Sequence, residues 1–438
     1  MSELALFGGE PVIDSPAEEL FRWPVFGTAE EEAVLEILRE PDFFNDTVVP
    51  AFERDFAQWL GVEHALTESS GTHAVLGALF ACGVGKGDEV IVPSLSYWAS
   101  CVQIMSLKAT PVFADVDRET LNISAEDVRR KITDNTRAIV VVHLLGYPVD
   151  MDAILDIARP RGIKVIEDAS HAHGSRYKGR MVGALGDISA FSLCGKSISI
   201  GEGGIIATDD RGLWERAVAW GHNFRFNDLE VKDPELLQYA GLPLGGVTSR
   251  MHNLSGALGR VQLARYDERM AEIDRAMSYF WDLVEDVPGI SAHRPPRESG
   301  STMGGWYNPH AIYHADELSG LSAARYVEAV RAEGYQAWTR KCIKDPLHPH
   351  PLFHTADVYR DGVPTVIAHA ARDTRLGADD LPNAMAARAF TVPPFRSFRP
   401  DVIERYAEIF RKVSRNHAEL LADDRGDHAV VVDERGDG

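Results

Sequence analysis

The stretch GDISAFSLCGKSISIGEGGIIAT, residues 186 to 208, holds two short runs rich in β-branched residues with a single lysine between them. The runs at 188–193 and 204–209 have the length and composition of buried strands. Lys196 stands in the connection between them, among small and apolar residues rather than among other charges. Burying a lysine amine is costly, so we interpret Lys196 as a chemical group rather than as a solvated surface charge.

Further strand-like runs precede this stretch, at 89–94, 111–116, 138–145 and 164–169. Segments with helical spacing lie between the runs, at 73–84, 124–132 and 151–162. This alternation predicts an α/β fold with a large, mostly parallel sheet that is covered on both faces. Ligands of such sheets bind at the carboxyl ends of the strands, so we expect the functional residues in the turns that follow them.

The second half of the chain predicts a further unit, because 438 residues exceed what a single core usually holds. Helices are expected at 266–287, 323–334 and 399–422, with short strands within 307–314 and 388–395. We therefore expect a large α/β domain over residues 1–265, the N-terminal segment included, and a smaller C-terminal α+β domain over 266–421. The charged tail at 422–438 is expected to be poorly ordered.

Charge and composition limit the classes of partner. The 45 Lys and Arg residues face 66 Asp and Glu residues, and the net charge of −21 disfavours nucleic acid and anionic membranes as partners. No run is long and apolar enough to cross a bilayer, and the first residues lack a secretion signal, so we expect a cytoplasmic protein with small-molecule partners. The four cysteines lack the paired spacing of disulfides or zinc sites, which predicts reduced thiols and no metal.

The turn ESSGTHAVLGAL, residues 68–79, places small residues directly before a helical run. A helix amino terminus offers unpaired N–H groups, and Gly71 would allow a phosphate group to approach them closely. The alternative is that Ser69, Ser70 and Thr72 only cap the helix.

The stretch VIEDASHAHG, residues 165–174, ends a hydrophobic strand with two carboxylates and two histidines. An exposed loop after a strand is the alternative interpretation. Asp168 and Lys196 are separated by one predicted strand, so both would lie at strand ends and could meet over one ligand. After another strand, Tyr97 or Trp98 could stack on a flat ring, although aromatic residues in such places are usually core.

These groups together match the needs of pyridoxal phosphate. A lysine amine forms a Schiff base with an aldehyde, and a carboxylate opposite a pyridine nitrogen keeps that nitrogen protonated. The phosphate turn, the carboxylate and the lysine appear here in one chain on an alternating α/β pattern, which is more specific than any one of them.

The same segments, together with PVFADVD (111–117) and LGRVQLARYDE (258–268), resemble the DegT/DnrJ/StrS family of sugar and cyclitol aminotransferases, which are fold-type-I pyridoxal-phosphate enzymes. The resemblance covers about residues 25 to 275 and, more thinly, extends to about 420. The segments ALFGGEPV and PLHPHPLF are most similar to the inosose aminotransferase branch of antibiotic and other natural-product pathways.

The resemblance implies a role for each candidate residue. Lys196 would form the Schiff base and carry the proton, Asp168 would pair with the pyridine nitrogen, and His171 would lie near the ring hydroxyl. Tyr97, rather than Trp98, would stack on the ring. The phosphate would be held by Gly71, Thr72 and Ser192, and Thr248 would reach the phosphate in the neighbouring subunit of a homodimer with shared active sites.

The implied reaction moves an amino group from glutamate or glutamine, through pyridoxamine phosphate, to the carbonyl group of a keto-sugar, cyclitol or other cyclic acceptor. Related sugar dehydratases carry histidine in place of the lysine, so a dehydratase or lyase is the second hypothesis. A cofactor-binding sensor or structural subunit without turnover is the third.

The chain departs from the family in two places, and the first is the motif N-x-R-M-x-E. The sequence here is TSRMHN, with Thr248 at the asparagine position and Asn253 at the glutamate position, which puts the contact across the subunits in doubt. The second is the preceding segment 223–246, which differs from the usual connection of the family and is longer. It either shapes the acceptor pocket or is a diverged surface loop. The segment 341–353 could bring Lys341, Lys344, His348 or His350 to the substrate, or form an exposed loop.

Overall fold

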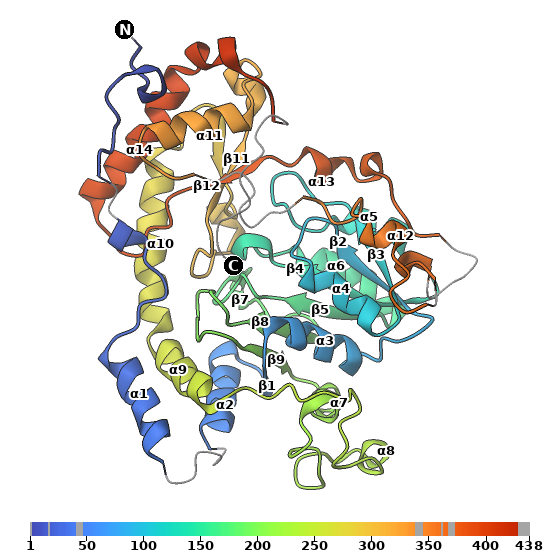
Figure 1. Cartoon of the computed structure of the whole chain (residues 1–438). Coiled ribbons are helices and arrows are strands. Elements are labelled where there is room, and N and C mark those ends of the chain that lie inside the picture. Colours follow the sequence, from blue (N-terminus) through green and yellow to red (C-terminus); the bar gives the residue numbers. More distant parts are fainter. Residues whose placement is uncertain are drawn as a thin grey trace.

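The computed structural model describes residues 2–15, 18–40, 47–337, 345–360, 362–366 and 373–427. Two packed units are visible in Figure 1, a large one with a central sheet on the right and a smaller one at the upper left. The long helix α10 (Tyr266–Leu283) runs along the left side and enters the smaller unit.

A seven-stranded sheet forms the centre of the large unit, in the order β1-β9-β8-β5-β4-β2-β3. Its strands are β1 (His64–Glu68), β2 (Glu89–Pro93), β3 (Thr110–Ala114), β4 (Thr136–Val142), β5 (Lys164–Asp168), β8 (Ile188–Ser192) and β9 (Gly204–Thr208). Only β9 runs antiparallel to its neighbours among these described strands. The predicted α/β class and its mostly parallel sheet are confirmed, and β1 is a strand that was not predicted.

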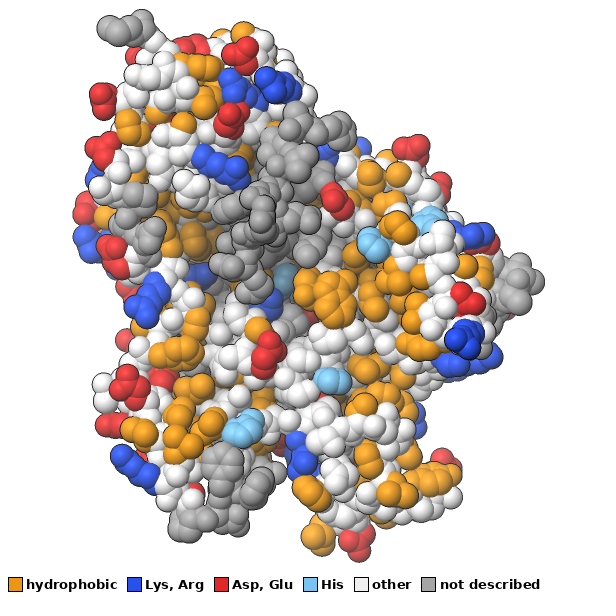
Figure 2. All heavy atoms as spheres, viewed as in Figure 1, with side chains coloured by type: hydrophobic (Ala, Val, Ile, Leu, Met, Phe, Trp, Pro, Cys, Tyr) orange, Lys and Arg blue, Asp and Glu red, His pale blue; other side chains and the backbone are white. Residues whose placement is uncertain are grey.

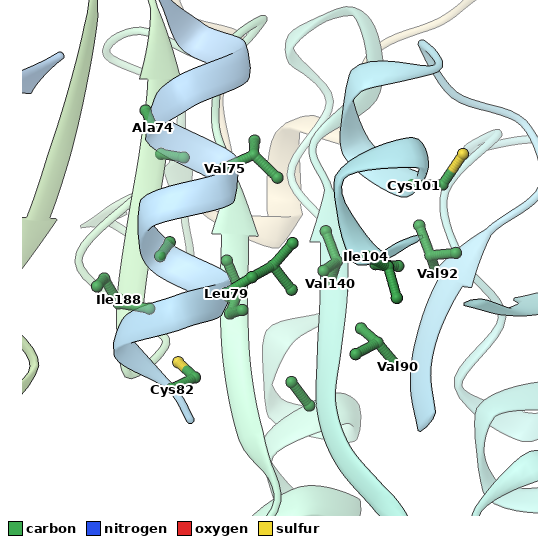
Figure 3. Packing of buried hydrophobic residues seen from close by; sticks show 14 of the residues in the cluster. Ala74, Val75, Leu79, Cys82, Val90, Val92, Cys101, Ile104, Val140 and Ile188 are labelled. Atoms are coloured by element: carbon green, nitrogen blue, oxygen red, sulfur yellow. The ribbon is translucent and has the colours of Figure 1, made fainter. Parts of the chain in front are cut away.

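Helices cover both faces of the sheet because alternate strand residues are apolar. Val90 and Val92 point into one core and Ile91 into the other. Helices α3 (Gly71–Ala81), α4 (Ala99–Ser106) and α7 (Arg211–Gly221) pack on the first face. Helices α2 (Val48–Leu60), α5 (Ala125–Lys131) and α6 (Met151–Ala158) pack on the second. Figure 3 shows α3 and α4 packed against the strands of the first face.

The smaller unit combines a short antiparallel sheet with three helices. The sheet has the order β10-β11-β12, formed by β10 (Ile290–Ala292), β11 (His310–Tyr313) and β12 (Ala389–Thr391). Its core is filled by aromatic residues of α10, α11 (Ala323–Ala332) and α14 (Pro400–Arg415), among them Phe280, Tyr326 and Phe410. The helices and the two strands expected in this region are present, and β10 is additional.

Packing departs from the expected division of the chain in two places. The N-terminal residues Leu4 and Ile13 are buried in the core of the smaller unit, where the Glu333 carboxylate accepts the N–H groups of Ala5 and Val12. In the other direction, α12 (Leu352–Thr355) and α13 (Pro382–Ala386) bury apolar residues in a core of the large sheet. The smaller unit therefore includes the N-terminal residues, and the large unit includes α12 and α13 from the second half of the chain.

The unusual segment 223–246 projects from α7 and contains the short α8 (Pro234–Leu237). Arg225 anchors it through an ion pair with Glu53 of α2 at 2.8 Å, and also pairs with Glu230 of the same segment at 2.8 Å. Figure 2 shows hydrophobic side chains gathered on this projection, where Phe224, Leu229, Tyr239, Leu242 and Leu244 are exposed. The chain then returns through α9 (Asn253–Ala264), which packs against α1 (Thr28–Arg39) and α2.

The remaining sequence expectations concern cysteines, metals, membranes and the tail. Cys82, Cys101 and Cys194 are free thiols, and Cys342 lies outside the described residues. Across the described ranges, no helix has the length and apolarity to cross a membrane and no side-chain cluster could hold a metal ion. Of the tail, Asp424 accepts hydrogen bonds from Ser322, and residues 428–438 lie outside the described residues.

Candidate active site

Most of the predicted site residues lie at the carboxyl ends of neighbouring strands. Strand β5 ends at Asp168 and its partner β8 ends at Ser192, with Lys196 in the turn that follows. The amino terminus of α3 approaches the same turn, since a Cβ added to Gly71 would lie 2.4 Å from Cβ of Ser192. The topology therefore brings the three segments together at one edge of the sheet, as expected for this fold.

Lys196 is half-buried and is held by distant parts of the chain. Its Nζ donates to the hydroxyl of Tyr307 at 3.0 Å and lies 4.4 Å from the centre of that ring. Its backbone carbonyl accepts the indole N–H of Trp23 at 2.8 Å. Tyr307 precedes β11 and Trp23 lies in the N-terminal segment, so both the smaller unit and the N-terminal segment close over the lysine.

Asp168 is buried and its carboxylate has a fixed orientation. Oδ2 accepts the hydroxyl of Ser100 at 2.7 Å, and that hydroxyl accepts in turn from Ser96 at 3.0 Å. Oδ1 accepts the backbone N–H of Ser170 at 3.2 Å. Only 6% of the residue is exposed, which excludes the exposed-loop interpretation of this carboxylate.

His171 is a buried, neutral imidazole beside the lysine. Burial lowers its pKa far below the ordinary value, and the positive charge of Lys196 lowers it further. Its Nδ1 accepts the backbone N–H of Leu145 at 3.3 Å, so the ring proton resides on Nε2. The ring lies 4.5 Å from that of Tyr307, which leaves Nε2 as a hydrogen-bond donor in the site.

The turn before α3 combines a capped helix start with a close approach to Ser192. Ser70 caps the helix, because its hydroxyl accepts the N–H of His73 at 3.2 Å, as the capping interpretation expected. The first-turn N–H groups of Gly71 and Thr72 have no acceptor within the helix. Gly71 is needed for the close approach to Ser192, and an anionic group could bind to the two N–H groups at this helix start.

Tyr97 and Trp98 follow β2 and are exposed by 44% and 40%. Their ring centres lie 5.2 Å apart, and the exposure excludes the interpretation of both as core residues. Ser100, two residues after Trp98, bonds Asp168, which joins the segment of the aromatic pair to this carboxylate.

The remaining candidate residues are Thr248 and those of the segment 341–353. Thr248 is exposed before α9 and makes no hydrogen bond to Gly71, Ser192 or Lys196 in the described part of the chain. Its contact across a homodimer stays a prediction. Of the segment 341–353, Lys341 and Lys344 lie outside the described residues and His350 bonds locally to Leu352.

His348 is not part of an exposed loop. It is 1% exposed, and its Nδ1 lies 2.6 Å from the hydroxyl of Ser94, directly after β2. It therefore joins α12 to the large sheet.

Comparison with known proteins identifies the family. Residues 25–374 match the model of the DegT/DnrJ/EryC1/StrS aminotransferase family. The chain belongs to this family. It is 32% identical to L-glutamine:scyllo-inosose aminotransferase of Streptomyces griseus over 96% of this chain and 99% of that one. It is 30% identical to spore coat polysaccharide biosynthesis protein SpsC of Bacillus subtilis over 89% and 95%. A match to GDP-perosamine synthase of Escherichia coli O157:H7 reaches 43% identity but spans 58% of that protein.

Solved structures agree with this assignment. An aminotransferase from Psychrobacter cryohalolentis superposes with a TM-score of 0.77 at 28% identity, covering 91% of this chain and 99% of that one. For 3-amino-5-hydroxybenzoic acid synthase the TM-score is 0.72 at 26% identity, covering 92% and 98%. The chain is thus a pyridoxal-phosphate-dependent aminotransferase of the sugar aminotransferase family, which confirms the predicted family, fold type, enzyme class and cofactor.

The fold alone does not separate transamination from dehydration. Escherichia coli GDP-4-keto-6-deoxy-D-mannose-3-dehydratase with bound hydrated PLP has a TM-score of 0.73 at 23% identity, covering 89% of this chain and 98% of that one. The residues of the site must therefore distinguish amino transfer from dehydration.

Proposed function

We propose that this aminotransferase moves an amino group from glutamate or glutamine to a carbonyl group of a cyclic acceptor, such as a keto-sugar, a cyclitol or another natural-product intermediate. The proposal rests on the position of the Lys196 amine. This amine lies 3.0 Å from the Tyr307 hydroxyl and beside the neutral His171. The full-length similarity to an inosose aminotransferase supports a cyclic acceptor and an amino-acid donor.

Each cofactor group has matching residues in the site. Gly71, Thr72 and Ser192 would hold the phosphate, Asp168 the pyridine nitrogen and Nε2–H of His171 the ring hydroxyl, with Tyr97 against the ring face. When bound through Lys196, the pyridine ring accepts the electron pair that is left when the donor C–H bond breaks.

The residues of the chain supply the proton transfers and the orientation. Nζ of Lys196 would take the proton from the α-carbon of the donor and pass it to the cofactor carbon that receives the amino group. In the second half reaction the same amine would carry a proton in the opposite direction, to the acceptor carbon. Tyr307 keeps this amine in place through its hydroxyl. Ser100 and the N–H of Ser170 fix both Asp168 oxygens, so the carboxylate has one orientation in which it would meet the pyridine nitrogen.

A dehydratase is the second candidate, because the same fold supports that reaction. By resemblance, the related sugar dehydratases carry histidine where this chain has Lys196. The retained lysine favours amino transfer, and the intact carboxylate and phosphate cradle disfavour a sensor without turnover.

A two-step assay tests the proposal. The holoenzyme is mixed with glutamate or glutamine while its visible absorption is followed, and a panel of keto-sugars and keto-cyclitols is then added. We expect the absorption to be lost with the donor and restored by an acceptor, with mass spectrometry showing an aminated product in equal amount. Lys196→Ala should abolish both steps.

A matched lysine controls for the loss of a charge. Lys178 is exposed and paired with Asp152 at 2.6 Å, so Lys178→Ala should leave both steps unchanged. A dehydrated product without nitrogen would contradict amino transfer, and normal turnover by Lys196→Ala would contradict the assigned lysine.

A further inference from the structure

Trp23 is a residue of the N-terminal segment that holds the main chain of the lysine. Its indole N–H donates to the backbone carbonyl of Lys196 at 2.8 Å, although the two residues lie 173 positions apart in the sequence. The amine at the other end of the lysine is held separately, by the hydroxyl of Tyr307 at 3.0 Å. Two segments that are distant in the sequence therefore hold the two ends of this one residue.

The turn that contains the lysine is supported unevenly. After the lysine, Ser197 and Ile198 are buried, with 2% and 0% of their surface exposed. Before it, Cys194 and Gly195 are exposed, and a Cβ added to Gly195 would meet no atom within 4 Å. Gly195 also has a φ of +60°, a left-handed conformation that glycine adopts easily. Lys196 thus stands where open chain meets packed chain, and the hydrogen bond from Trp23 restrains that point.

The segment that carries Trp23 is itself anchored on both sides. Before it, the ring of Phe21 packs edge-on against Tyr406 at 5.3 Å, beside the core of the smaller unit. After it, the carboxylate of Glu30 accepts the N–H of Gly27 at 2.9 Å and fixes the start of α1. The indole is therefore presented from a fixed frame rather than from a loose end of the chain.

We propose that Trp23 is a positioning residue that keeps the Lys196 amine within reach of both carbon atoms between which it moves a proton. This inference rests on the proposed function, in which the amine acts in each half reaction. A lysine carries its amine on a flexible four-carbon stem, so fixing the main chain at the base of that stem limits where the amine can go. Correct placement of a proton-transfer group is worth a large part of its effect on the rate.

The first test uses the apoenzyme and needs no turnover. The N–H of Leu193 donates to the carbonyl of Gly203 at 2.9 Å, and the N–H of Ile200 donates to the carbonyl of Leu193 at 3.0 Å, so both amides report opening of the turn. Replacing Trp23 by benzothienylalanine keeps the shape of the ring and exchanges its N–H for sulfur. We expect hydrogen exchange at both amides to become about 2- to 10-fold faster, since one hydrogen bond is lost. Exchange at the wild-type rate would overturn the proposal.

The second test compares the two half reactions of the holoenzyme by single-turnover absorption changes. We expect the same replacement to slow both rate constants about 10-fold and to leave the donor and acceptor Kd values within about 2-fold, because the lysine moves a proton in each half reaction. A donor deuterated at its α-carbon should show an isotope effect at least as large as in the wild type. A loss confined to one half reaction, or raised Kd values with unchanged rate constants, would overturn the proposal.

A second tryptophan provides the matched control. Trp214 of α7 donates its indole N–H to the carbonyl of Ala65 in β1 at 3.3 Å, which is the same kind of bond in another part of the fold. Trp214→Phe should leave exchange in the turn and both half reactions unchanged, whereas Trp23→Phe should reproduce the effects of benzothienylalanine.

The pattern of exchange separates positioning from a general structural role. Faster exchange throughout the smaller unit, rather than in the turn around the lysine, would overturn the proposal in favour of such a role. A wild type that reacts with no donor would instead contradict the proposed function, and the apoenzyme experiment would still decide whether Trp23 restrains the turn.

Discussion

Asp168 is fixed by neutral donors rather than by a positively charged side chain. The Ser100 hydroxyl and the Ser170 N–H occupy one lone pair on each oxygen, and Ser96 supports the hydroxyl from behind. The carboxylate therefore has a fixed orientation toward the group that would bind opposite to it.

Ser100→Ala is predicted to lower kcat about 10-fold while changing KM little, because a hydrogen bond to a charged group is lost but no substrate contact is removed. Steady-state kinetics measure the split, and circular dichroism checks the fold. Ser96→Ala, which reaches Asp168 only through Ser100, should have a smaller effect. An unchanged kcat in Ser100→Ala would show that the hydroxyl does not position the carboxylate.

At the residue scale, the sequence predicted the groups that follow strands and missed those that come from elsewhere. Lys196 and Asp168 are found because Asp168 ends a recognisable strand and Lys196 lies in the turn after another. Tyr307 begins a run that was predicted only as a strand, and Trp23 lies in a segment without such a pattern, so only the tertiary packing brings them to the lysine. Their aromatic character alone does not distinguish them from core or surface residues.

At the scale of the element, the start of α3 is the most constrained feature of the site. Gly71 is the first helical residue and touches Ser192, so β8 and α3 are joined where the phosphate would bind. A side chain at this position would push the helix terminus and the turn after β8 apart.

Gly71→Ala is predicted to weaken cofactor affinity more than 10-fold, because the added Cβ would lie 2.4 Å from Cβ of Ser192. Titration of the apoenzyme with pyridoxal phosphate, followed by tryptophan fluorescence, measures the Kd. Gly85→Ala is the matched control, since a Cβ there meets no atom within 4 Å. Equal affinity in Gly71→Ala and wild type would contradict the phosphate cradle.

Strand prediction succeeded where runs were long and apolar and failed where they were short. Each apolar, β-branched run of the large unit became a strand, namely β2, β3, β4, β5, β8 and β9. Strand β1 has the sequence HALTE and β10 only ISA, so neither has enough apolar residues to be recognised locally. These two segments become strands by pairing with β9 and β11, so their strand structure depends on the assembled sheets.

At the scale of the whole molecule, the boundary between the units contains buried, uncharged histidines. Burial lowers the pKa of His173 and of His310 to about 3, and that of His293 to about 4. Both ring nitrogens of His173 lack a hydrogen-bond partner among the described residues. These histidines are therefore protonated at a much lower pH in the folded state than in the unfolded chain, where their pKa is near 6.5.

Stability is predicted to fall as the pH decreases below about 6.5. Because the folded pKa values are depressed, these histidines contribute stability that is complete above the unfolded pKa and is lost between pH 6.5 and about 3. Each group adds a slope of about 1.4 kcal/mol per pH unit in that range. Urea unfolding of the apoenzyme between pH 7 and 5 measures the slope, and His173→Leu should reduce it by about one such increment. An identical slope in the variant would contradict the assignment.

The division into units was the least predictable part of the fold. The N-terminal segment and the residues around α12 and α13 have ordinary local sequences, yet each packs on the unit more distant along the chain. Such exchanges depend on which apolar surfaces remain uncovered after each sheet has formed, and no local pattern encodes that.

Borohydride reduction of the holoenzyme followed by peptide mass mapping, with and without prior addition of glutamate or glutamine, tests the assignment of Lys196 as the Schiff-base lysine. We expect a cofactor-derived mass on the peptide that contains Lys196, and loss of that label when at least one of the two donors is added first. A label on another lysine, or a label on Lys196 that neither donor removes, would contradict this assignment.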